Sequence, residues 1–312
     1  MDILLLSFSC VAPFIIYLFL GFTSKKILKI SSATFLDINT IVFRIFLPLN
    51  LFFNIYRSDF ASVNLSRPLL IGLICVLVFF LLAMIYYGKR NIPNADKSVM
   101  IQNSFRSNFI LLGIELTESI MGTEVSALGG VMTVMFIPLF NVLAVLVFSF
   151  YAKEKVSFIK VLARILKNPL IISSLLALVL NYFNVSVSDW LFNVLFPLGK
   201  MATPLALFAL GGRFVFTTDR ESRKLLFEGL LFRLILIPLI VMLIIIPMGI
   251  RGEALALFLV LFGGPVAVTS YTMAQQMGGN EQLAAQLLVY TTVFSTFTLF
   301  VFISIFKSYG FF

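Results

Sequence analysis

The chain consists almost entirely of apolar runs, each about as long as a membrane-crossing helix, joined by short polar loops. Of its 312 residues, 60% are hydrophobic and 12% are charged, and its mean hydropathy is +1.06. A helix needs about 20 apolar residues to cross the hydrocarbon layer. We therefore predict an all-α integral membrane protein with ten transmembrane helices. The predicted spans are Leu4–Phe22, Thr34–Ile55, Pro68–Tyr87, Ser98–Gly122, Glu124–Phe150, Asn168–Asn184, Ser188–Gly212, Leu225–Gly249, Glu253–Gly278 and Glu281–Phe306.

The basic residues are distributed unevenly over the predicted loops. Of the 23 Lys and Arg residues, 15 fall in four alternate loops, and the loops on the opposite side contain only Arg57, Arg67, Arg251 and Lys307. Because cytoplasmic loops collect positive charge, we expect a multi-pass protein of the plasma (inner) membrane with both termini outside. Topology thus accounts for the pI of 9.6, and no nucleic-acid partner is expected.

The two halves of the chain resemble each other when the sequence is shifted by half its length, 156 residues. Pro13 then aligns with Pro169, "RIFLPLNLF" (Arg44–Phe52) aligns with "KMATPLALF" (Lys200–Phe208), and "MG" at 121–122 aligns with "MG" at 277–278. We therefore predict two five-helix repeats, residues 1–156 and 157–312. Since five is odd, the second repeat enters the membrane inverted, as in many secondary transporters.

The fourth and ninth predicted spans carry helix-interrupting or polar residues near their middle. The ninth contains Gly263, Gly264 and Pro265, and the fourth contains Ser107 and Asn108. Lipid does not tolerate unpaired backbone groups, so we expect the two interrupted helices to cross at mid-membrane and to line a cavity inside the protein. A proline kink without a ligand is the alternative.

The residue types at these interruptions suit an anion. Pro265 fits the first turn of a helix, and a half-helix that begins after Gly264 presents free N–H groups with a partial positive charge. In the fourth span, Arg106 and Ser107 accompany Asn108. Asn108 donates hydrogen bonds without the desolvation cost of a buried charge; its alternative role is to cap a half-helix.

Three further basic residues lie inside predicted spans. Arg44 and Lys200 are the deepest in uninterrupted spans, where charges usually face a cavity or the bundle interior. Two roles stay open for this pair: raising the electrostatic potential for anions, or binding backbone carbonyls of the interrupted helices. Arg233 is expected to extend to the cytoplasmic interface, paired with Glu228, without a functional role.

Two acidic residues of the fourth span, Glu115 and Glu118, lie one helical turn apart on the same face. Within the membrane, burial and like charge both favour retention of a proton by such a pair. We therefore predict that Glu115 and Glu118 couple transport to a proton. If both lie at the outer mouth instead, they are hydrated and have no such role.

Two segments resemble signatures of the auxin efflux carrier family, which in bacteria includes many organic-acid permeases. "FRSNFILLGIELTESIMG" resembles the signature of the family's fourth helix, and "GGPVAVTSYTMAQQMGGNEQLA" resembles that of the ninth. The resemblance covers essentially the whole chain. It implies a scaffold domain, a transport domain and alternating access at the crossing of helices 4 and 9. It also implies that Asn108 contacts a substrate carboxylate and that Pro265 is the crossover proline.

The sequence departs from the family pattern at two positions. Glu115 stands where the fourth-helix motif usually has proline, and Ser270 replaces a second proline found in the ninth helix of plant auxin carriers. Both departures argue against auxin as the substrate.

The predicted function is secondary active transport of a small organic anion, without enzymatic activity, cofactor or metal. The expected partners are this anion, the lipid bilayer and protons, and a homodimer is left open. The predicted substrate-binding residues are Arg106, Ser107, Asn108, Gly264, Pro265, Val266, Thr269 and Ser270.

Three other functions compete with this prediction. A sodium-coupled organic-anion symporter of the bile-acid type shares the crossed-helix plan. Such symporters carry an acidic residue in the ninth helix, whereas no acid lies between Glu253 and Glu281 here. The second is an intramembrane enzyme, but the chain lacks common catalytic groups, because it has no histidine and no Gly-x-Ser-x-Gly motif. A passive channel or sensor is the third.

Overall fold

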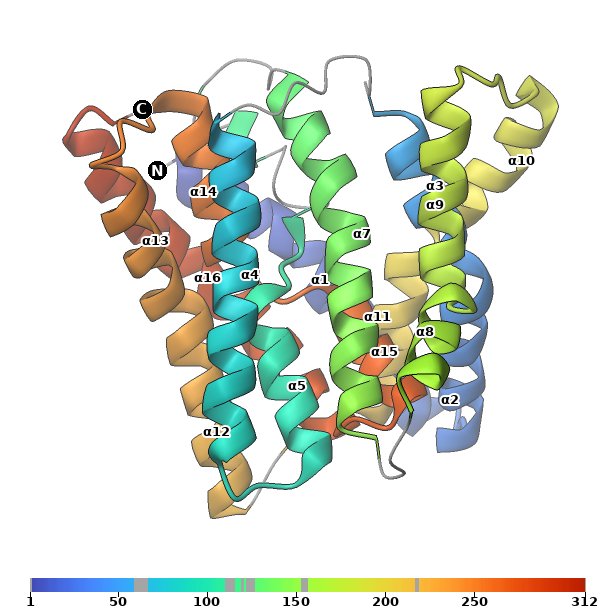
Figure 1. The fold of residues 1–312 in the computed structure, drawn as a ribbon. Coiled ribbons are helices and arrows are strands. Elements are labelled where there is room, and N and C mark those ends of the chain that lie inside the picture. The colour runs from blue at the N-terminus through green and yellow to red at the C-terminus, as the bar shows by residue number, and fades with distance from the viewer. Residues whose placement is uncertain are drawn as a thin grey trace.

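In the computed structural model, described for residues 2–58, 67–109, 116–118, 121, 127–152, 157–216 and 219–311, every regular element is a helix (Figure 1). The first half contains α1 (Asp2–Ile27), α2 (Ser32–Ile41), the π-helix η1 (Val42–Phe46), α3 (Leu47–Tyr56), α4 (Arg67–Lys89), α5 (Asn94–Phe105) and α7 (Ala127–Phe150). The second half contains α8 (Phe158–Leu166), α9 (Pro169–Tyr182), α10 (Asp189–Lys200), α11 (Ala202–Arg213), α12 (Arg220–Leu231), the π-helix η2 (Phe232–Leu236), α13 (Ile237–Ile245), α14 (Gly252–Gly263), α15 (Val268–Met277) and α16 (Glu281–Ser308).

Seven helical stretches of the described chain are long and apolar enough to cross a membrane: α2–η1–α3, α4, α7, α10–α11, α12–η2–α13, α14–α15 and α16. The pair α8–α9 forms an eighth if it is one span bent by 62°. Helix α1 occupies the first predicted span, and α5 occupies the start of the fourth, much of which lies outside the described residues. The all-α, multi-pass class is confirmed, and the ten-span inverted repeat stays a prediction.

Two of these spans contain a π-helix directly before a proline. Pro48 stands at the second position of α3, after η1, and Pro238 stands at the second position of α13, after η2. Proline has no N–H and its ring crowds the carbonyl four residues earlier. A π-turn accommodates such a disturbance within a helix, so each span continues through its proline.

The apolar side chains divide between a core and an outer surface. In α14, every residue from Leu255 to Gly263 is buried, whereas α4 exposes Ile74, Leu81 and Ile85 by more than half. An outer surface of this kind suits contact with lipid. Figure 1 also shows both chain ends at one end of the bundle, while α5 and α12, which follow basic loops, begin at the other.

Helices α1 and α11 approach each other closely. A Cβ added at Gly211 would lie 2.0 Å from the carbonyl oxygen of Leu18, so only glycine fits at this contact. Small residues permit such close packing between helices in a membrane, where the hydrophobic effect does not drive helices together.

Candidate functional site

Helix α5 is interrupted at the polar residues that predicted a break. It ends at Phe105, and Arg106 continues in an extended conformation with φ −95° and ψ 119°. Two residues further on, the backbone N–H of Asn108 donates to the carbonyl oxygen of Pro265 at 2.8 Å. The interruption after α5 therefore lies directly against the interruption between α14 and α15.

The interruption between α14 and α15 is an extended segment of four residues. Gly264 ends α14 with φ −67° and ψ 159°, and α15 begins at Val268. The prediction that Pro265 opens the second half-helix is therefore wrong by three residues. The residue before a proline is pushed toward extended conformations, and Ala267, directly before α15, is extended as well. The backbone N–H of Val266 donates to Thr291 Oγ1 at 3.1 Å, which satisfies one group of this segment.

A fully buried arginine holds the end of α14. Arg233 on η2 donates from Nε to the carbonyl oxygen of Gly264 at 2.8 Å and from Nη2 to that of Leu261 at 3.0 Å. The last carbonyls of a helix have no intrahelical donor and carry partial negative charge, so a cation suits this place. The expectation that Arg233 extends to the interface and pairs with Glu228 is wrong, because Glu228 pairs with Arg90 at 2.8 Å.

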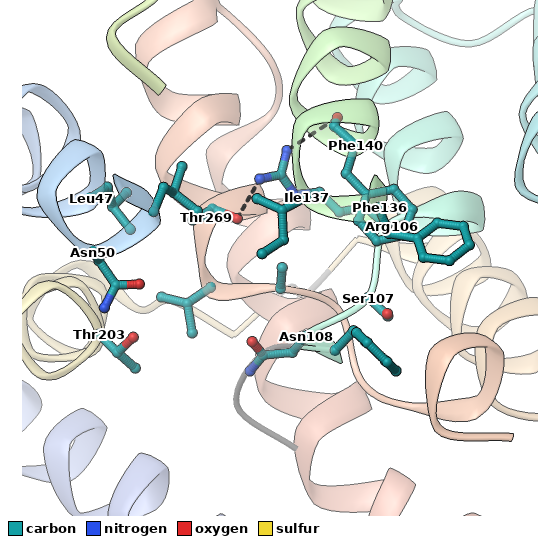
Figure 2. Close-up of a pocket in the computed structure, with 14 residues that line it drawn as sticks. Leu47, Asn50, Arg106, Ser107, Asn108, Phe136, Ile137, Phe140, Thr203 and Thr269 are labelled. Carbon is teal, nitrogen blue, oxygen red and sulfur yellow. Dashed lines mark hydrogen bonds between the residues drawn. The ribbon is translucent and has the colours of Figure 1, made fainter. Parts of the chain in front are cut away.

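A cavity of about 40 Å³ lies at the meeting point of the two interruptions. Residues of α3, α7 and α11 complete its lining, which consists of Leu47, Asn50, Leu51, Arg106, Ser107, Asn108, Phe109, Phe136, Ile137, Phe140, Thr203, Ala267, Val268 and Thr269. Figure 2 shows Asn50 and Thr203 on one side of the cavity and Ser107 and Asn108 on the other. Since Ala267, Val268 and Thr269 line it, the N-terminal end of α15 faces the cavity.

Arg106 supplies a positive charge to this cavity. Its side chain is buried, and Nη2 donates to Asn141 Oδ1 at 2.7 Å and to Thr269 Oγ1 at 2.6 Å (Figure 2 shows the bond to Thr269). Nη1 contacts Met273 Sδ at 3.0 Å and the carbonyl oxygen of Phe140 at 3.5 Å. In the described part of the chain, ion pairs form at Arg90 and Arg213, and none forms at Arg106.

Several buried polar atoms around the crossing have no hydrogen-bond partner in the described structure. They are Ser107 Oγ, Asn108 Nδ2, Asn141 Nδ2, Ser270 Oγ and Nη1 of Arg233. Buried polar groups are normally paired. A cluster of unpaired donors beside a buried cation is therefore a place where a polar ligand or water would gain hydrogen bonds.

The structure brings only part of the predicted site to the cavity. Arg106, Ser107, Asn108 and Thr269 line it. The other four contribute otherwise: Gly264 and Pro265 provide backbone carbonyls to Arg233 and Asn108, whereas Val266 and Ser270 are buried beside the cavity rather than in its lining.

The predicted electrostatic and coupling residues have other positions. The side chains of Arg44 and Lys200 are exposed, and the ammonium of Lys200 lies 4.6 Å from the centre of the Phe196 ring. Neither residue lines the cavity or binds a carbonyl of the interrupted helices in the described structure. Glu115 lies outside the described residues, and Glu118 is half-buried.

Sequence reasoning missed three polar residues of the site. Asn50 on α3 and Thr203 on α11 line the cavity, and Asn141 on α7 accepts from Arg106. Each is a polar residue in an otherwise apolar span, and this feature of the sequence could have indicated a position facing the cavity.

A multi-pass helical protein whose interrupted helices meet at a cavity lined by a buried arginine has the architecture of a membrane transporter. The comparison with known families gives the same result: residues 6–303 match the family model described as membrane transport protein. This is the auxin efflux carrier family, and the chain belongs to it. The family consists of transporters rather than enzymes, which agrees at this general level with the predicted non-enzymatic function. No curated protein matches the chain.

Proposed function

We propose that the chain is a secondary active transporter that moves a small organic anion, a carboxylate, across the plasma membrane. The observation that carries this proposal is the buried guanidinium of Arg106, which lines the cavity without a carboxylate partner among the described residues. Burial of an unpaired ion costs several kcal/mol. An anionic substrate would offset this cost.

The contacts around Arg106 leave hydrogen-bonding capacity for a carboxylate. Nη1 is held only by the thioether of Met273 and by a long contact to Phe140, and a thioether is a weak acceptor. Across the same space, Nδ2 of Asn108 has no partner. The N-terminal end of α15 adds partial positive charge. Charge-assisted hydrogen bonds to a carboxylate are stronger than the contacts they would replace.

The size of the cavity supports a site that opens and closes. A volume of about 40 Å³ holds a few water molecules, so a larger ligand requires the lining helices to separate. We propose that α3 and α11 on one side move relative to the crossing on the other, which gives alternating access.

The helix order of the two halves supports an inverted repeat as the basis of this motion. The spans Ser32–Tyr56 and Asp189–Arg213 both have 25 residues, and each is divided into consecutive helical pieces, α2–η1–α3 in the first and α10–α11 in the second. Their separation is close to the 156-residue shift that aligns the sequence halves. Repeats of this kind commonly supply the two related conformations of a transporter.

The plasma-membrane location, the outside position of both termini and proton coupling through Glu115 and Glu118 belong to the same proposal. The first two rest on the basic loops, and the third rests on the spacing of the two acids. The family match gives no support to the sodium-coupled alternative.

A ligand screen tests the anion site. The purified full-length protein would be heated with mono- and dicarboxylates and with their neutral amides, since a ligand that binds the folded state raises its unfolding temperature. Carboxylates should stabilise the protein and the amides should not. Arg106→Gln should abolish this stabilisation, whereas Lys200→Gln, which removes an exposed cation outside the cavity, should retain it.

The substitution Asn108→Ala provides a second, milder test. Loss of one hydrogen bond to a charged group typically costs about 1–3 kcal/mol, so carboxylate affinity should fall roughly 5- to 150-fold. Equal stabilisation by carboxylates and their neutral amides would contradict the proposal, as would unchanged affinity in both Arg106→Gln and Asn108→Ala.

A further inference from the structure

An apolar groove runs between α4 and the helical stretch η2–α13, away from the substrate cavity. Its volume is about 600 Å³, and its lining is Phe79, Leu82, Ala83, Ile85, Tyr86, Tyr87, Lys89, Arg90, Ser104, Phe232, Leu236, Ile237 and Ile240. Leu82, Ile85 and Ile240 are each more than 40% exposed. The groove therefore opens on the outer, apolar surface of the bundle.

A basic cluster adjoins one end of this groove. It comprises Arg90, Arg220, Arg223 and Lys224, which together with Phe227, Glu228 and Leu231 line a second depression. Arg90 lines both the groove and this depression, so the two adjoin at this residue. Four cations face a single carboxylate, that of Glu228, which Arg90 already binds at 2.8 Å. The cluster thus has an excess of positive charge.

The position of these cations on α12 increases the demand for an anion. Arg220, Arg223 and Lys224 lie in the first two turns of α12, where the helix dipole also contributes positive charge. The same end already has two acids, because Asp219 caps the helix by accepting from the N–H of Ser222 and Glu221 lies in the first turn. The three cations outnumber these acids, so an anion bound beside them would be stabilised. Phe227, whose side chain is 69% exposed, lies next to them.

The groove has the length of one leaflet. Ten residues of α4 separate Phe79 from Lys89, which corresponds to about 15 Å of helix. This is half of the hydrocarbon thickness of roughly 30 Å. The basic cluster lies at the end of the bundle where α12 begins (Figure 1), beside the loops that the charge bias assigns to the cytoplasmic side.

The side chains of Tyr86, Arg90 and Phe232 border the basic end of the groove. The Tyr86 and Phe232 rings meet edge to face, with 5.7 Å between their centroids, and the Arg90–Glu228 pair connects the end of α4 to α12. A polar cap over an apolar channel is the arrangement that suits a molecule with a charged head and a long apolar tail.

We propose that this groove and basic cluster bind an anionic phospholipid of the inner leaflet. Its phosphate contacts Arg220, Arg223 and Lys224, and an acyl chain occupies the groove between α4 and α13. Basic pockets between transmembrane helices on the cytoplasmic side bind anionic headgroups in this way. The site is separate from the substrate cavity, so its failure would leave the transport proposal untouched.

The test is lipid titration of the full-length protein in neutral detergent, with bound lipids counted by native mass spectrometry. Dioleoylphosphatidylglycerol should bind, and the affinity for dioleoylphosphatidylcholine should be at least about tenfold lower. The triple variant Arg220→Gln, Arg223→Gln, Lys224→Gln should lose the preference. The matched control is Lys160→Gln, Arg164→Gln, Lys167→Gln, on α8 and directly after it. It removes as many exposed charges and should keep the preference.

Two further experiments distinguish a bound lipid from a free phosphate compound. Soluble glycerophosphoglycerol, which has the headgroup without acyl chains, should not displace the bound lipid. Ala83→Leu narrows the groove without changing a charge, and it should weaken binding. The proposal is overturned if both lipids bind equally, if both triple variants behave alike, if the soluble headgroup displaces the lipid, or if Ala83→Leu binds as well as wild type.

Discussion

The backbone N–H of Asn108 donates to the carbonyl oxygen of Pro265 at 2.8 Å, so one hydrogen bond connects the interruptions of two helices far apart in the sequence. Arg233 adds a second connection, because it binds the carbonyl oxygen of Gly264 next to that proline. An unpaired backbone group at this depth would cost several kcal/mol. The two interruptions therefore stabilise each other, and a disturbance of one should reach the cavity formed by both.

The substitution Gly264→Ala should disrupt this meeting point. An added Cβ would lie 2.4 Å from the carbonyl oxygen of Val260, so the extended segment has to shift and the carbonyl of Pro265 shifts with it. We expect carboxylate binding to fall at least about tenfold, the scale of one lost charged hydrogen bond. Binding would be measured by thermal shift and by uptake into proteoliposomes.

The control for this substitution is Gly130→Ala in α7. A Cβ at Gly130 meets no atom within 4 Å, and alanine favours the helix over glycine, so binding and stability should be retained. Equal effects of the two substitutions would show that the close contact at Gly264 is unimportant.

Replacement of Arg233 should destabilise the fold. Arg233→Gln leaves at least one carbonyl at the end of α14 without its donor, because glutamine is shorter and has a single amide. A lost hydrogen bond to a charged group costs about 1.5–3 kcal/mol, which should lower the unfolding temperature by several degrees. Arg44→Gln is the matched control, since Arg44 lies on the other π-helix with an exposed side chain. If Arg233→Gln were as stable as this control, Arg233 would not stabilise the end of α14.

These two arginines show how far the sequence alone could predict the site. Composition, run length and charge bias were sufficient for the class of protein, and the positions of Asn108 and Pro265 were sufficient for the two interruptions. The sequence assigned an interior position to Arg44 and an interfacial one to Arg233, whereas in the structure Arg44 is exposed and Arg233 is fully buried. Each lies on a helix apolar on nearly all sides, so the pattern does not specify which side faces the core.

The sequence predicted the site only where proline or glycine changes the local backbone conformation. Proline and glycine interrupt a helix for local reasons, and so the crossing region could be found. Asn50 and Asn141 lie on helices that continue through their prolines, and their place at the cavity follows from packing between spans. A single sequence contains no information on that packing beyond its apolar pattern.

A hydrogen-bond network connects α2 to the part of α15 that runs away from the cavity. Asn39 on α2 accepts from Thr272 Oγ1 at 3.0 Å and donates to Gln275 Oε1, and both partners belong to α15. Just beyond the end of α15, the N–H of Asn280 donates to the carbonyl of Ala95 on α5. We therefore expect this network to act as the gate on the basic side.

The substitution Asn39→Ala should open this gate more often. Loss of a buried hydrogen bond of about 1 kcal/mol shifts a two-state equilibrium roughly fivefold. In a background without Cys10 and Cys75, the variant Ser107→Cys reports access to the cavity by its reaction rate with a membrane-impermeant thiol reagent. Added on the basic side, the reagent should react about fivefold faster after Asn39→Ala. Thr298→Val, outside the network, should leave the rate unchanged, and an unchanged rate with Asn39→Ala would argue against the gate.

The proposed orientation predicts which face of the membrane each loop occupies. In the same cysteine-free background, Asn94→Cys lies beside a basic loop, whereas Val185→Cys lies in the loop after α9. An impermeant thiol reagent applied outside intact cells should label position 185 and spare position 94. The reverse pattern would invert the topology and exchange the two sides of the gate.

The last prediction concerns proton coupling through Glu115, the residue that departs from the family pattern. Glu118 follows three positions later in the sequence, and the proposal is that a helix through both residues brings the two carboxylates to one face, where they share a proton. Wild-type uptake should therefore depend on a pH gradient between about pH 5 and 8, where such a shared proton exchanges. Glu115→Gln has nearly the volume of a protonated glutamate but cannot release a proton. This variant should keep carboxylate binding and exchange while its uptake loses the dependence on the gradient. Asp189→Asn, which removes an acid at the first turn of α10, is the control and should behave as wild type. Uptake by wild type that ignores pH, or a Glu115→Gln variant with the pH profile of wild type, would exclude the coupling role.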